Sequence, residues 1–189
     1  MKYPLQVLSA AVCLGLLPAL VQAVEYGKLP QDKSSIVFVS RQMGVPVEGA
    51  FRKFTANLRI NPAKPEAGVA QIEIELGSID AGSKDANDEV AGKNWFNIAE
   101  FPKASFTSTA VKSLGGGKYE AEGKMTMKGK SLNVHAPFTM REDKGLLHIG
   151  GSFNLKRLDF GIGSGLWSDT SVVADEVQIK FVFVLKQDR

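Results

Sequence analysis

The side chains that could do chemistry in this chain are few and stand apart from one another. There are two histidines, His135 and His148, and one cysteine, Cys13. A zinc site needs at least three protein ligands, and we identify no further ligands for the two histidines. No serine stands in a nucleophile-elbow motif, and the cysteine lies in an apolar run at the N-terminus. We therefore expect no metal, no cofactor and no enzymatic activity.

One pair of charged residues has an unusual position. Arg157 and Asp159 continue the alternating phase of Phe153 and Leu155, which is otherwise apolar. A strand that persisted to these residues would bring both charges to the rim of its sheet. Two roles are open: the pair could contact a ligand, or it could tie the glycine-rich crossover that follows to the sheet.

The elements that position these residues are strands, because apolar and polar side chains alternate over most of the chain. In the last strand, for example, Ile179 and Phe181 alternate with Gln178 and Lys180. The expected strands cover residues 35–39, 54–60, 71–76, 104–111, 118–127, 131–140, 146–155 and 173–185. Residues 42–49, which include two glycines and a proline, are expected to interrupt the strand pattern.

The pattern changes once, at Ser83, which is a suitable N-cap for a short helix over residues 84–91. The rest reads as eight mostly neighbouring antiparallel strands, each with one apolar face. Such strands predict an all-β fold, either a sandwich or a closed barrel. Closure would remove the exposed sheet edges and leave room for one ligand.

The N-terminus has the features of a secretory signal. Lys2 precedes an apolar run over residues 5–21, and Val21 and Ala23 are suitable for cleavage after Ala23. We expect residues 1–23 to be removed and residues 24–189 to form one domain without cysteine. The net charge of the whole chain is only +3, and no basic cluster is present, which argues against nucleic acid as a partner.

Three blocks carry a family resemblance: Trp95-Phe96-x4-Phe101-Pro102-x-Ala104-x-Phe106-x-Ser108, Gly123-Lys124-Met125-Thr126-Met127-Lys128-Gly129, and Arg157-x-Asp159-Phe160-Gly161-Ile162-Gly163. Over nearly all of residues 24–189 the chain resembles the YceI family of secreted bacterial lipocalin-like proteins. The resemblance implies an eight-stranded antiparallel lipocalin-like β-barrel, with one short α-helix here, in the periplasm. It also implies a long isoprenoid in the lumen, such as a polyprenyl pyrophosphate or a ubiquinone-type tail, and no catalysis.

The apolar faces alone could form either a packed core or a cavity, and the resemblance favours a cavity that binds lipid. Small inward residues, such as Gly123 and Gly151, would leave space for a tail. Trp95, Phe96, Phe101 and Trp167 could cover one mouth of the barrel or plug its end. The expected ligand-binding residues are Phe38, Phe54, Leu58, Ile72, Ile74, Trp95, Phe96, Phe101, Phe106, Met125, Met127, Val134, Phe138, Phe153, Leu155, Arg157, Phe160, Trp167, Ile179 and Phe181.

Arg157 would then face a pyrophosphate or a quinone oxygen with its rigid donor fork, unless it serves only to tie the loop. The expected partners are the isoprenoid lipid, a membrane protein that uses quinones or handles lipids, and a second copy in a homodimer. The alternative is a filled barrel without lipid that acts as a structural or stress-related interaction protein.

Overall fold

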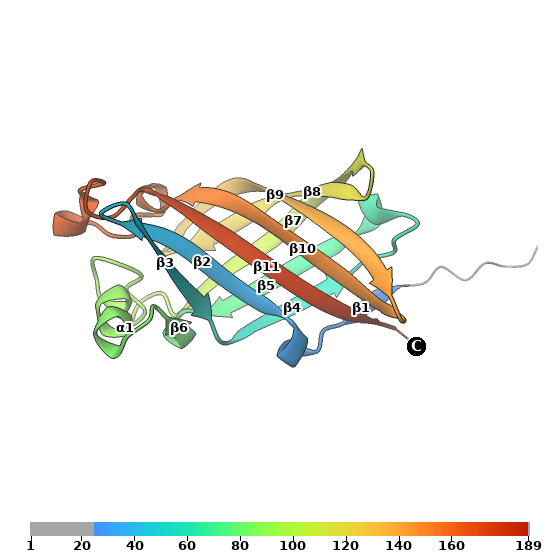
Figure 1. Ribbon diagram of the computed structural model, residues 1–189, viewed down its shortest axis with the longest axis horizontal. Helices are drawn as coiled ribbons and strands as arrows, with labels where there is room; N and C mark the ends of the chain where they lie inside the picture. Colours follow the sequence, from blue (N-terminus) through green and yellow to red (C-terminus); the bar gives the residue numbers. More distant parts are fainter. Residues whose placement is uncertain (1–24, 189) are drawn as a thin grey trace, which may run out of the picture.

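A curled antiparallel sheet dominates the computed structural model, which describes residues 25–188 (Figure 1). The expected signal peptide, residues 1–23, lies outside the described residues. The all-β class is confirmed, but the described residues form eleven strands rather than eight. The strands are β1 Tyr26–Lys28, β2 Ser35–Gln42, β3 Val45–Phe51, β4 Phe54–Arg59, β5 Val69–Glu75, β6 Ile79–Asp80, β7 Lys103–Gly115, β8 Lys118–Met127, β9 Lys130–Asp143, β10 Leu146–Lys156 and β11 Glu176–Gln187.

The sheet curls into a lipocalin-like barrel whose strands follow the order β4-β5-β7-β8-β9-β10-β11-β2-β3-β6. The short strand β1 pairs with the end of β11. On its other side, Tyr26 exchanges two backbone hydrogen bonds with Ile60, at 2.9 and 3.1 Å, just beyond β4. Strand β1 therefore joins the two sides of the sheet at the end of the barrel where the C-terminus lies (Figure 1).

Strand β3 was missed because its sequence looks like a break. Its backbone pairs with β2 from Ile36 opposite Phe51 to Gln42 opposite Val45. Met43 and Gly44 form the hairpin turn, with φ values of 46° and 79°, as a tight turn between twisted strands requires. Pro46 is tolerated because β3 pairs with β6 only at its other end. The remaining strands that were missed, β1 and β6, are too short to show an alternation.

The segment expected to be a crossover is a long hairpin loop. Strands β10 and β11 are neighbours and pair directly over eleven residues, from Leu146 to Lys156. The connection, residues 157–175, contains two short 3-10 helices, η4 (Arg157–Phe160) and η5 (Gly165–Ser168). We call it the 157–175 loop. It folds over the end of the barrel opposite the C-terminus (Figure 1).

Helix α1, Lys84–Ala91, lies at the same end of the barrel as the 157–175 loop (Figure 1). The expected N-cap is confirmed, since the Ser83 hydroxyl accepts a hydrogen bond from the Ala86 N–H at 3.1 Å. None of the described helices is long and apolar enough to cross a membrane. The helix leads into the loop that carries Trp95 and Phe96.

The glycines expected to leave space in the barrel are covered by phenylalanine rings. A Cβ atom added to Gly151 would lie 2.5 Å from the Phe181 ring and 2.3 Å from the Pro137 carbonyl oxygen. A Cβ atom on Gly123 would lie 2.5 Å from the Phe106 ring. The space directly above these glycines is therefore filled by the rings, and the rings themselves line the free space of the barrel. Strands β2 and β3 repeat the arrangement, with the Phe38 ring over Gly49.

The Gly151–Phe181 contact gives a test of this packing. We expect Gly151→Ala to lower the free energy of unfolding by about 2 kcal/mol, since the new methyl group overlaps a backbone oxygen and a ring. The matched control is Gly150→Ala, because a Cβ atom there has its nearest neighbour at 4.0 Å. The control should stay within about 0.5 kcal/mol of the parent. Urea unfolding measures both, and equal stability of the two variants would contradict the packing described.

Candidate functional site

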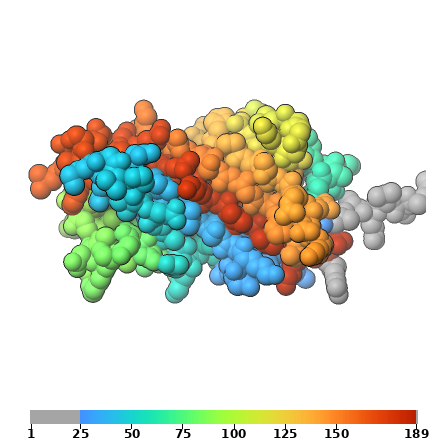
Figure 2. All heavy atoms as spheres, viewed as in Figure 1, coloured from blue at the N-terminus to red at the C-terminus, as the bar shows by residue number. Residues whose placement is uncertain are grey.

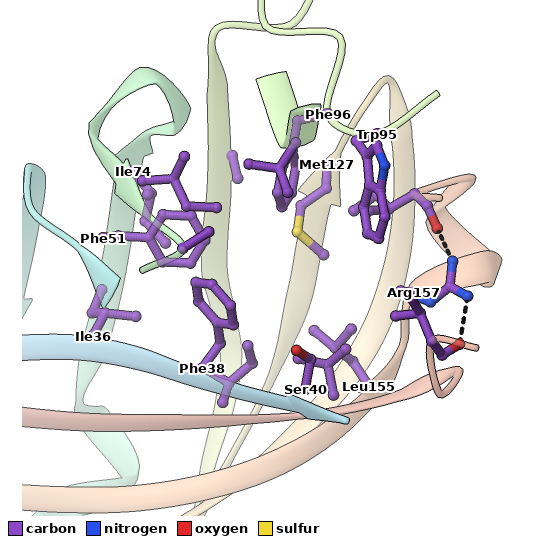
Figure 3. A pocket seen from close by; sticks show the side chains of 18 of the residues that line it. Ile36, Phe38, Ser40, Phe51, Ile74, Trp95, Phe96, Met127, Leu155 and Arg157 are labelled. Carbon is purple, nitrogen blue, oxygen red and sulfur yellow. Dashed lines mark hydrogen bonds between the residues drawn. The ribbon is translucent and has the colours of Figure 1, made fainter. Parts of the chain in front are cut away.

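The barrel encloses two neighbouring cavities, with volumes of about 330 and 90 Å³. The larger one is at the low end of the range of about 300–1,000 Å³ that is usual for small-molecule sites. Its walls are mainly aliphatic and aromatic, and Figure 3 shows Phe38, Phe51 and Ile74 around the same space. The cavities share five lining residues: Ile36, Ile74, Phe106, Met125 and Ile179.

Most of the residues expected to bind a ligand line one of these cavities. The expected residues that line the larger cavity are Phe38, Ile74, Trp95, Phe96, Phe106, Met125, Met127, Leu155, Arg157, Trp167 and Ile179. Those that line only the smaller cavity are Leu58, Ile72, Phe138, Phe153 and Phe181. The arrangement combines a packed core with a cavity, so the two alternatives left open by the sequence are both partly realised.

Four of the expected residues line neither cavity: Phe54, Phe101, Val134 and Phe160. Phe54 packs edge-on against Phe183, with ring centroids 6.0 Å apart. Phe160 is buried in the core, and half-buried Val134 packs against the core. Phe101 covers the β8–β9 turn, where a Cβ atom on Gly129 would lie 3.0 Å from its ring. Alternation cannot separate a residue that faces a cavity from one that faces packed side chains.

The mouth of the larger cavity is held by a carboxylate between two indoles. The Glu89 Oε1 atom accepts hydrogen bonds from Trp95 Nε1 at 3.2 Å and from Trp167 Nε1 at 2.7 Å. The two rings lie 5.5 Å apart between centroids. These hydrogen bonds join helix α1, the loop that carries Trp95 and Phe96, and the 157–175 loop over the mouth of the cavity. Glu89 was not among the expected site residues, because a polar residue on an exposed helix gives no signal in the sequence.

Arg157 lies beside this mouth but uses all of its donors within the protein. Its side chain is only 2 % exposed. Nε donates to the Ala174 carbonyl at 3.0 Å, and Nη1 donates to those of Ile162 and Gly163, both at 2.9 Å. Nη2 donates to the carbonyls of Trp167 and Val173, at 2.6 and 2.7 Å. A guanidinium group has five N–H bonds, so none is left for a ligand.

The structure thus supports the second role considered for Arg157, which is to tie the loop. The side chain of Asp159 does not share this role, because it is exposed and forms no ion pair with Arg157 among the described residues. Burial lowers the pKa of Arg157, and the carboxylate of Asp175 opposes that shift. The guanidinium also lies 5.6 Å from the centre of the Trp95 ring (Figure 3).

The 157–175 loop is also attached to its neighbours on two sides. Met43 N–H donates to the Val172 carbonyl at 2.8 Å, which joins the loop to the β2–β3 hairpin. Gly163 and Ser164 both donate to the Asn94 carbonyl at 2.8 Å, which joins it to the segment after α1. Figure 2 shows the hairpin in cyan, the loop in orange-red and α1 in green at one end of the molecule.

One group of possible metal ligands lies outside the barrel. Glu120, Glu122 and His135 place ligand atoms within 4.8 Å of one another on β8 and β9. The sequence did not reveal it, because the contact forms across two strands. Lys112 pairs with Glu122 and lowers the pKa of that carboxyl. A cation there would have to displace the lysine.

The fold and the cavity define a small β-barrel protein with an apolar, ligand-sized interior. The family model of the YceI-like domain matches residues 28–185. The chain therefore belongs to the YceI-like family, as its sequence blocks suggested.

Relatives agree with this assignment. A UPF0312 protein of Shewanella sp. (strain W3-18-1) is 27 % identical over 186 residues, which cover 94 % of this chain and 97 % of that protein. A UPF0312 protein of Azotobacter vinelandii is 30 % identical over 124 residues, which cover 62 % of this chain and 65 % of that protein.

Solved structures show the same fold. The crystal structure of Burkholderia cenocepacia BcnA matches with a TM-score of 0.81 and 46 % identity, over 83 % of this chain and 99 % of that one. A polyisoprenoid binding domain from Saccharophagus degradans matches with a TM-score of 0.65 and 16 % identity, over 87 % of this chain and 98 % of that one. The second likeness concerns the fold alone.

Replacement of Arg157 tests its role in holding the mouth. We expect Arg157→Met to lower the free energy of unfolding by about 3–5 kcal/mol, because several loop carbonyls lose their donor. Arg157→Lys should recover only part of the loss, since an ammonium group offers three donors. Lys156→Met, at an exposed neighbour, is the control and should be nearly neutral. Urea unfolding gives the values, and a near-neutral Arg157→Met would show that the loop is held by other contacts.

Proposed function

We propose that this protein is exported to the periplasm, cleaved after Ala23, and binds the tail of an isoprenoid lipid in its barrel, to carry or to sequester it without converting it. The observation that carries the proposal is the pair of adjoining apolar cavities inside the barrel. Membership of the YceI-like family supports it. The polyisoprenoid binding domain of Saccharophagus degradans, which shares the fold, supports it further.

The energetics suit a flexible apolar tail. Burial of one isoprene unit removes roughly 100 Å² of apolar surface from water, worth about 2.5 kcal/mol before the ordering costs are subtracted. The walls include Met125 and Met127, whose thioether side chains adapt to irregular shapes. Affinity would thus come from the tail, and the depth of the barrel would limit its length.

A filled barrel that acts only through its surface is the weaker candidate. Such a barrel would have no ligand-sized space within it, whereas this one holds a cavity of about 330 Å³. A membrane protein that uses quinones or handles lipids stays a prediction as a delivery partner, and so does a homodimer.

The direct test is native mass spectrometry of the processed protein from the periplasm of its own cells, followed by organic extraction. We expect a protein that begins at Val24 and carries a stoichiometric lipid whose mass is spaced in isoprene units. A bare protein that also takes up no added prenyl lipid would overturn the binding proposal. A protein that keeps residues 1–23 would overturn the export proposal.

A variant at the junction of the two cavities tests where the tail lies. Ile179 lines both cavities, so the larger ring in Ile179→Phe should narrow the passage between them. We expect the affinity for geranylgeraniol to fall by about fivefold to tenfold, measured by tryptophan fluorescence. Val182→Phe adds a ring at an exposed position on the same strand and should leave the affinity unchanged. Equal affinity of both variants would place the tail outside this junction.

A further inference from the structure

The charges around the larger cavity are few, which makes its mouth easy to interpret. Among the described residues that line it, only Arg157 and Glu89 carry a charge. The uncharged polar side chains along the same walls are Ser40, Gln42 and Ser105. A lipid head group at this mouth would therefore meet two charged and three uncharged polar side chains of the cavity wall.

Arg157 offers little to an anionic head group. All five of its N–H bonds point at backbone carbonyls, and the side chain is almost fully buried. The negative end of each carbonyl dipole points at the guanidinium group. These dipoles therefore reduce the positive potential that Arg157 would present to a ligand.

Two lysines near this end of the barrel donate to backbone carbonyls outside the cavity lining. Lys128 Nζ donates to the carbonyls of Lys93 and Gly161, at 2.9 and 2.8 Å. Lys130 Nζ donates to the Asp159 carbonyl at 3.1 Å. Neither lysine lines the cavity.

Glu89 differs from Arg157, because one of its two carboxylate oxygens has no hydrogen-bond partner among the described residues. Both indole hydrogen bonds fall on its Oε1 atom, and Oε2 accepts no hydrogen bond from the described residues. The side chain lines the cavity near the C-terminal end of α1. The helix dipole places a partial negative charge at that end, so the helix adds to the negative potential of the carboxylate.

From these positions we infer that the barrel selects isoprenoids with an uncharged head group and discriminates against phosphorylated ones. A diphosphate at the mouth would meet a carboxylate and the negative end of a helix, with no free cation among the lining residues. A hydroxyl or carbonyl head group meets no such repulsion, and a hydroxyl could donate to Glu89 Oε2. This selectivity rests on the proposed function, because it presupposes that the tail lies in the barrel.

Two probes with the same tail and different head groups test the selectivity: farnesol and farnesyl diphosphate. The chain contains only two tryptophans, Trp95 and Trp167, and both lie at the mouth, so intrinsic fluorescence reports binding there. We expect farnesol to bind at least about tenfold more tightly than farnesyl diphosphate at low ionic strength. The difference should shrink when the salt is raised from about 20 mM to about 500 mM.

The decisive variant is Glu89→Gln, which removes the charge but keeps an oxygen that can accept the indole hydrogen bonds. It should raise the affinity for farnesyl diphosphate by about fivefold to tenfold, whereas the affinity for farnesol should not rise, because its hydroxyl group loses a charged acceptor. Glu66→Gln makes the same change of net charge at an exposed residue that lines neither cavity, and it should change neither affinity.

The outcomes separate the two proposals. If farnesyl diphosphate binds as tightly as farnesol, or if Glu89→Gln weakens its binding, the head-group selectivity is wrong while lipid binding stands. If neither probe binds and no added prenyl lipid is taken up, the proposed function fails and the selectivity fails with it. If Glu66→Gln acts like Glu89→Gln, the effect belongs to net charge, which also overturns the assignment to Glu89.

Discussion

The mouth of this barrel depends on one buried cation. The guanidinium group of Arg157 donates hydrogen bonds to five backbone carbonyl groups of the 157–175 loop, and the residue is almost fully buried. A loop of that length with several glycines would otherwise lose much conformational entropy in adopting one shape. A buried cation is costly unless its donors are satisfied, so the loop and the arginine stabilise each other. The loop in turn holds Trp167 against Glu89.

In the interior of the barrel, the free volume is limited by aromatic rings that pack over glycines. Phe106 and Phe181 occupy the space that side chains at Gly123 and Gly151 would fill. Each ring is thereby held against the wall, which limits how far it can turn into the lumen. Protein interiors are close-packed, so a space of about 330 Å³ is too large to be a packing defect. Its position beside the mouth makes it suitable for a ligand.

The sequence predicted the strands and the helix that have a local pattern, and it missed the contacts between residues that are far apart in the chain. Alternation revealed the long strands and the Ser83 cap revealed the helix, because both signals are local. Strand β3 was hidden, because a glycine and a proline in an edge strand look like a break. Glu89 and Trp167 are 78 residues apart, and Arg157 binds carbonyls, which every residue has. No pattern of residue types can reveal such contacts.

In the proposed function, recognition of the tail and recognition of the head group would depend on different residues. An apolar wall limits how much tail fits but does not respond to charge, whereas a carboxylate at the mouth responds to charge but not to tail length. Membership of the family is carried by the barrel and its sequence blocks, and Arg157 belongs to one of those blocks. Because its donors are used within the loop, its presence says little about the head group. The residue at position 89, on a helix outside the blocks, is the more informative one to compare between relatives.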